Sequence, residues 1–281
     1  MVCHSQAQAV SFSLSDLSPL HPVPRNHCLM VLKGYFDGAR QPDRIVIAAV
    51  CGTSEQWDSF SSRWNAVLGD HQAEFLHTTD AVALQEEFSA QNGWSKSCVN
   101  SFIGDCVSVI RDHIETPTRP GLFVVTLTIW IADFVRAREV VPSLPNTVEE
   151  LCTTESAGFC FARGRAIGAD YYHLYYDQGE PFYGHLDVRM RNKKARKAIP
   201  SLEKVAHYGP ANMRVVPALQ MADLFAWCIS HNDSVPRSWH RQLNQLNWQS
   251  KGLDYPHLLK PKKGALELLA SFRLPKRSPT R

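Results

Sequence analysis

The chain has 281 residues, of which 44% are hydrophobic and 20% are charged, and its formal net charge is +3. This composition is typical of a globular protein and excludes disordered, collagenous and coiled-coil classes. No segment approaches the roughly 18 uninterrupted apolar residues of a membrane-spanning helix, so we expect no membrane partner. The small net charge neither requires nor excludes a nucleic-acid partner, because the placement of the charges matters more than their sum.

Short apolar runs alternate with helical patterns from residue 29 onward. Apolar, β-branched and aromatic runs predict strands over residues 29–36, 45–50, 74–80, 122–132, 171–176 and 213–216. Apolar residues at helical spacing predict helices over residues 54–68, 99–114, 147–167, 181–197 and 218–231. We expect Ser54 to cap the first of these helices and Pro217 to open the last one.

The alternation of strands and helices after an opening hairpin predicts one α/β domain, with a mixed sheet covered by helices on its faces. We expect a disordered leader over 1–28, the folded domain over 29–235, and an irregular basic extension over 236–281. The leader has neither the basic start nor the apolar centre of a secretory signal. The eight cysteines include no CxxC pair, which argues against structural zinc, and scattered thiols fit a cytoplasmic location.

Carboxylates at strand ends and in one apolar helix are the features that point to chemistry. Asp37 and Asp177 each follow a predicted strand, and Asp223 lies in a helix that is apolar on nearly all sides. A buried carboxylate needs hydrogen-bond donors, a cation or a raised pKa, and its hard oxygen atoms suit Mg²⁺ or Mn²⁺. Gln220 lies one turn before Asp223 on the same helix face, where it is a candidate for holding substrate or a bound water.

Structural roles remain open for each of these residues taken singly. An Asp after a strand is commonly a turn residue or a helix cap, and an Asp in an apolar helix can serve a buried polar partner. The chain has no P-loop, HExxH, GxSxG or GxGxxG motif, so the sequence gives no support to nucleophilic or dinucleotide chemistry.

Basic residues recur at helical spacing in the segment 181–197. Four of them fall at i, i+4, i+7 and i+8, namely Arg189, Lys193, Arg196 and Lys197. If one helix runs through the whole segment, these side chains form a basic stripe that suits a phosphate backbone. A solvated helix face without a partner is the alternative interpretation.

Four short islands resemble, in this order, the bacterial domain of unknown function 3800 family, which belongs to the ribonuclease H-like folds. They are GYFDG at 34–38, EFLHTTD at 74–80 with Phe88 and Gly93-Trp94 after it, YYDQ at 175–178 and LQMADL at 219–224. The last island is the most specific of the four. The chain departs from the family where Gly38 and Ala39 replace the usual Glu and Ser, and where one extra residue separates Glu74 from His77.

The resemblance implies a ribonuclease H-like mixed sheet with helices on both faces, in which Asp37, Asp177 and Asp223 converge at one sheet edge. It implies that these acids hold two Mg²⁺ or Mn²⁺ ions for phosphodiester hydrolysis, in a nuclease or related phosphoryl-transfer enzyme acting on nucleic acid. Glu74 is then a candidate fourth ligand. His77 is a candidate proton shuttle, or alternatively a residue that bonds a backbone carbonyl.

A second function of another class stays open beside the enzyme. It is a catalytically silent module that keeps the fold and binds nucleic acid or a protein partner. Divalent-metal binding that depends on Asp37 and Asp223 separates the two interpretations, because idle carboxylates bind no ion.

Overall fold

The computed structural model describes residues 29–231 and 238–259, so the expected leader over 1–28 and the basic end over 260–281 lie outside the described residues. Within the described ranges the strands form one mixed sheet in the order β5-β4-β1-β2-β3-β6. Their bounds are β1 (Val31–Arg40), β2 (Arg44–Thr53), β3 (Phe123–Trp130), β4 (Tyr171–Asp177), β5 (Val205–Ala211) and β6 (Gln249–Leu253). β2 pairs antiparallel with β1 and with β3, whereas the other neighbouring pairs are parallel.

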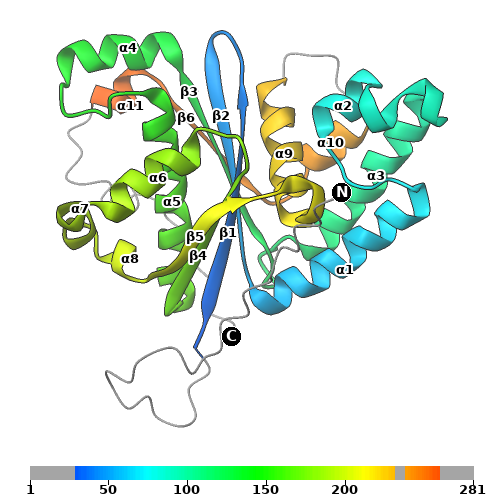
Figure 1. Cartoon of the computed structure of the whole chain (residues 1–281), viewed down its shortest axis with the longest axis horizontal. Coiled ribbons are helices and arrows are strands. Elements are labelled where there is room, and N and C mark those ends of the chain that lie inside the picture. Colours follow the sequence, from blue (N-terminus) through cyan, green and yellow to red (C-terminus); the bar gives the residue numbers. More distant parts are fainter. Residues whose placement is uncertain (1–28, 232–237, 260–281) are drawn as a thin grey trace, which may run out of the picture.

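Helices cover both faces of this sheet (Figure 1). One layer contains α4 (Ile131–Val140), α5 (Val148–Ile167), α6 (Phe182–Arg191), α7 (Lys193–Ala198), α8 (Pro200–Glu203) and α11 (Tyr255–Leu259). The other contains α1 (Ser54–His71), α2 (Thr78–Ala83), α3 (Lys96–His113), α9 (Pro217–Ser230) and α10 (Ser238–Asn244). Each layer encloses its own apolar core against the sheet. The predicted α/β architecture with helices on both faces is therefore confirmed.

The long predicted helices α1, α3, α5 and α9 are confirmed: α1 and α3 bury an apolar stripe, and α5 and α9 are buried on most sides. The cap of α1 differs by one residue from the prediction. The Thr53 hydroxyl accepts the Gln56 N–H, and the Gln56 side chain accepts the Thr53 N–H, so Thr53 and not Ser54 caps the helix. Pro217 opens α9 as expected.

Two predicted strands are wrong. The segment 74–80 runs extended only as far as His77, and α2 begins at Thr78. Residues 213–216 begin with the 3₁₀ turn η4 (Met213–Val215), where the Asn212 side chain accepts the Arg214 N–H. The strand of this region is β5, which lies at the sheet edge and therefore tolerates Gly209 and Pro210.

Three further segments differ from the predictions. The expected helix 181–197 is broken at Asn192, whose Oδ1 accepts the Lys194 N–H at 3.0 Å, so α6 and α7 are separate. The expected strand 122–132 ends at Trp130, and α4 follows it. The described part of the supposedly irregular extension forms α10, the edge strand β6 and α11.

The cysteines and the lengths of the helices are the remaining features of the described residues. All six cysteines of the described ranges are free, and five of them are buried: Cys51, Cys106, Cys152, Cys160 and Cys228. In those same ranges no helix has the length and apolar character needed to cross a bilayer.

Candidate active site

The three aspartates predicted to converge lie on one face of the sheet. β1 and β4 run parallel and pair as far as Phe36 and Tyr176, so Asp37 and Asp177 follow side by side. α9 packs against β1 and β2 and carries Asp223 onto this face. Asp37 is 3% exposed, and its pKa is raised well above the usual range by burial and then by the charges of Asp223 and Asp177. Acids from three distant parts of the chain thus share one electrostatic environment.

A fourth acid, Glu180, belongs to the same cluster and was missed by the sequence analysis. Gly179 adopts a φ of 105° after β4 and turns the chain, which leaves Glu180 half-buried beside the strand end. Burial and the charges of Asp177 and Asp223 raise the pKa of Glu180 to about 7. An acid three residues after a strand-ending acid, with a glycine between them, is the signal that points to it.

Backbone amides compensate part of this negative charge. Asp37 Oδ1 accepts the Gly38 N–H at 2.7 Å, and Asp223 Oδ2 accepts the Thr78 N–H at 2.6 Å. Asp177 Oδ1 accepts the Met213 N–H at 3.2 Å. Among the described residues, none of these aspartates forms a salt bridge with Lys or Arg. The cluster therefore favours bound protons or a bound cation, because buried like charges raise one another's free energy.

His77 is the side chain beside the acids that can become positively charged. Its Nδ1 lies 2.7 Å from Asp80 Oδ2, so a carboxylate and not a backbone carbonyl orients the ring. Burial lowers the pKa of His77, but the charges of Asp223 and Asp80 raise it more, and the net direction is upward. The neighbouring carboxylates therefore favour the imidazolium form of His77 more than water does.

Gln220 is fully engaged with the protein. Its Oε1 accepts the Trp64 indole N–H at 2.7 Å and the Leu76 N–H at 2.9 Å, and its Nε2 donates to the Met213 carbonyl at 2.9 Å. These bonds fix the segment before His77 and the turn whose Met213 N–H binds Asp177. Gln220 therefore positions the site, and its predicted contact with substrate stays a prediction.

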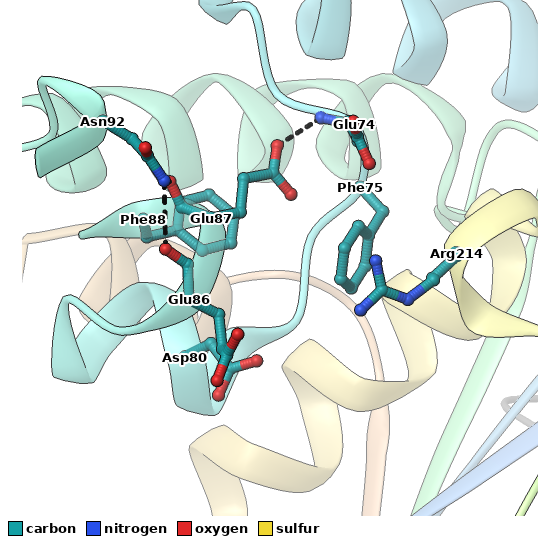
Figure 2. A pocket seen from close by; sticks show the side chains of 8 residues that line it. All are labelled: Glu74, Phe75, Asp80, Glu86, Glu87, Phe88, Asn92 and Arg214. Atoms are coloured by element: carbon teal, nitrogen blue, oxygen red, sulfur yellow. Dashed lines mark hydrogen bonds between the residues drawn. The ribbon is translucent and has the colours of Figure 1, made fainter.

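Glu74 is not brought together with the aspartates. It is exposed and lines a neighbouring cavity of about 240 Å³, in which its N–H donates to the Glu87 carboxylate (Figure 2). Arg214 lies over the Phe75 ring in this cavity, 4.4 Å from its centroid. Asp80, the partner of His77, also lines it, so the cavity adjoins the site without sharing Glu74 with it.

The basic residues do not form a stripe on one helix. Arg189 belongs to α6 and forms a salt bridge with Glu150 at 3.1 Å, whereas Lys193, Arg196 and Lys197 are exposed on α7. α6 and α7 lie in the helical layer opposite α9 (Figure 1). Their predicted contact with nucleic acid stays a prediction.

Side-chain packing explains why position 38 is a glycine and not the glutamate of the family pattern. A Cβ atom at this position would lie 2.3 Å from Cε2 of Phe182, whose ring closes the core under β1. Because side chains alternate along a strand, residue 38 points away from the face that carries Asp37. A glutamate at position 38 would meet the Phe182 ring and not the acid cluster.

The donor chemistry of the cluster suits a divalent cation, because carboxylate oxygens are the ligands that Mg²⁺ and Mn²⁺ prefer. Within residues 29–231 and 238–259, however, no group of three or more His, Cys, Asp and Glu side chains is arranged to hold a metal ion. The acids interact through their charges across the site. Holding an ion therefore requires the carboxylates to move closer together than they lie here.

Comparison with protein-family models finds no match, and comparison with curated proteins finds none either. The resemblance to the domain of unknown function 3800 family thus depends on the four sequence islands and is not supported by a family model.

Proposed function

We propose that this protein is a divalent-metal-dependent nuclease, or a related phosphoryl-transfer enzyme, with a ribonuclease H-like fold. The observation that carries the proposal is the convergence of Asp37, Asp177 and Asp223 from β1, β4 and α9 on one face of the sheet. The resemblance implies an Asp on a central first strand, an acid after the fourth strand and an Asp on the last helix, whereas α10 and α11 follow α9 here. The central place of β1, between β2 and β4, supports the same fold.

Asp37, Asp177 and Asp223 would hold Mg²⁺ or Mn²⁺, and Glu180 replaces Glu74 as the candidate for a fourth carboxylate ligand. When bound, two such ions supply an activated water and charge stabilisation at the phosphate oxygens of a nucleic-acid substrate. The charge that the backbone amides leave uncompensated supports cation binding, because an ion offsets both the burial and the mutual repulsion that raise the pKa values of Asp37 and Glu180. The free thiols of the described residues support the cytoplasmic location expected from the sequence.

His77 has the proton-transfer role in this proposal. Asp80 holds its Nδ1 at 2.7 Å, which leaves Nε2 as the ring atom available for exchange. Since the nearby carboxylates raise the pKa of His77, they favour the imidazolium, which would give a proton to a leaving oxygen. His77→Gln is expected to slow cleavage and to remove its pH dependence near neutrality.

A catalytically silent binding module is the second candidate, and one observation favours it. No group of three or more ligands in the described ranges stands ready around a metal position, and one oxygen of each aspartate already accepts a backbone N–H. In that case the acids hold the segments of Thr78 and Met213 in place and bind no ion.

Cleavage of labelled DNA and RNA with Mn²⁺ or Mg²⁺, together with a metal titration of the melting temperature, tests the proposal. We expect Asp37→Asn and Asp223→Asn to lower cleavage at least about a hundredfold and to abolish the metal-induced rise in melting temperature. Asp112→Asn, at an exposed site on α3, is the matched control and retains both properties.

The outcome that contradicts the enzyme is specific. If wild type cleaves none of these substrates and its melting temperature ignores both ions, the silent module replaces the nuclease. If the two site variants cleave as fast as wild type, the activity belongs to another site.

A further inference from the structure

The face of the sheet that carries the acids also carries basic and aromatic side chains in register with them. Side chains alternate along strands, so every second residue of β1, β4 and β5 shares this face. The strand pairing places these residues opposite one another on neighbouring strands. Along the strands they form a basic row, an aromatic row and an acid row: Lys33 with His173 and His207, Tyr35 with Tyr175, and Asp37 with Asp177.

The aromatic row is a column of rings that pack against one another. The rings of Tyr35 and Tyr175 stack with their centroids 5.0 Å apart and their planes at 17°, and both residues are half-buried. Buried Trp57 packs edge-on against Tyr35 at 4.9 Å. The exposed His207 ring ends the column, 5.2 Å from the Tyr175 centroid. A planar ligand can continue the column at this exposed end, because the packed rings lose little side-chain freedom on binding.

The basic row is short of negative partners. Burial lowers the pKa of His173, and the charges of His207 and Lys33 lower it further. In the part of the chain that the structure describes, none of these three side chains forms a salt bridge. Since its lowered pKa favours the neutral His173 ring, Lys33 supplies the charge that attracts an anion to this row, and phosphate is the anion that accompanies planar bases.

The order and spacing of the rows match a nucleic-acid strand. Adjacent rows are two residues apart along each strand, so the basic and acid rows are separated by about 13 Å. We propose that this face binds single-stranded nucleic acid, with a phosphate on the basic row and an unpaired base stacked on the aromatic row. The backbone then continues toward Asp37 and Asp177. Only an unpaired base exposes its ring face, so the surface selects single strands over duplexes.

This inference deepens the proposed function and rests on it for the role of the acid row. Binding to the basic and aromatic rows is measured without divalent metal, so the test does not depend on cleavage. Fluorescence anisotropy in EDTA with a fluorescein-labelled single-stranded oligonucleotide, and with the same strand annealed to its complement, gives both affinities.

We expect Tyr175→Ala to weaken single-strand binding at least about tenfold, and Tyr175→Phe to retain it because the ring remains. Tyr208→Ala is the matched control, since Tyr208 is the next half-buried tyrosine on β5 but points toward α6, where it bonds Asp187. Lys33→Gln is expected to weaken binding and to reduce the salt slope by about one phosphate contact.

Four outcomes decide the matter. If Tyr175→Ala binds like wild type, or if wild type prefers the duplex, the inference is wrong even where cleavage is intact. If wild type binds no oligonucleotide but sediments as a dimer that Tyr175→Ala dissociates, a second copy of the chain occupies this face. If Tyr175→Ala loses binding while wild type cleaves nothing, the single-strand-binding face is confirmed and the proposed nuclease activity is wrong.

Discussion

β2 and β3 are buried along almost their full length, whereas β1 and β4 bury little more than alternate residues. Helices cover both sides of β2 and β3, so Ile47 packs toward the α5 layer and its neighbour Ala48 toward the α9 layer. On β4, Leu174 meets the same α5 core, but Tyr175 on the other face is only half-buried. The basic and aromatic rows lie where one helical layer is incomplete and keep contact with solvent, whereas the acid cluster beyond them is more enclosed, with Asp37 and Asp223 buried.

The largest expected effect contrasts the two regions directly. Ile47→Asp places a carboxylate in a fully buried site and is expected to cost more than about 4 kcal/mol of folding free energy. His173→Asp, on the open face of β4 beside Lys33, is expected to cost less than about 1 kcal/mol. Urea denaturation measures both, with Ile47→Thr as the milder core variant if Ile47→Asp does not fold. Equal losses of folding free energy at the two sites would show that residue 173 is as buried as the core.

The second effect probes the covered face of β1. Gly38→Ala brings a Cβ atom to within 2.3 Å of the Phe182 ring, and we expect this overpacking to cost about 1–3 kcal/mol. Phe182→Leu in the same chain should recover part of the loss, because the shorter side chain makes room for the methyl group. A double-mutant cycle gives the coupling between the two positions. If the free-energy changes of the two single variants simply add in the double variant, contact with the Phe182 ring does not explain why residue 38 is a glycine.

The same contrast explains which strands the sequence predicts. The strands β1 to β4 are interior, and each is recognisable from its own apolar run. The edge strands β5 and β6 were missed, because their sequences VAHYGPA and QSKGL carry Gly, Pro and polar residues that only an edge tolerates. Their pairing depends on tertiary contacts with β4 and β3, which no local pattern reveals.

Local sequence likewise predicts some residues of the candidate site and not others. Asp37, Asp177 and Asp223 could be predicted because strand ends and an apolar helix mark them locally. Glu180 was missed although the glycine between it and Asp177 signals a turn, because the burial and the charge of Asp223 that make it part of the cluster depend on tertiary structure. Gln220 was noticed on its helix face, but its three bonds reach residues 64, 76 and 213, and such distant partners do not appear in local spacing.

The smallest effect concerns the charge that the open face carries. The pKa of Glu180 is raised from 4.5 to about 7, so between these values the folded protein binds a proton that the unfolded chain has released. Stability without divalent metal is therefore expected to fall as the pH rises from about 5 to about 7. Added Mn²⁺ should offset the loss at the upper end, because the ion replaces the proton as the partner of the acids.

Glu180→Gln separates this residue from the rest of the cluster. Because Glu180 is partly exposed, screening reduces the effect, and we expect the variant to be about 1–2 kcal/mol more stable than wild type at pH 7 in EDTA. Its dependence of stability on pH should also be flatter over this range, whereas Glu203→Gln, at an exposed site on α8, should follow wild type. Urea unfolding at a series of pH values measures both slopes. If Glu180→Gln keeps the wild-type dependence of stability on pH, the proton resides on Asp37 and its aspartate neighbours. The pH dependence then comes from acids on β1 and α9 and not from the turn after β4.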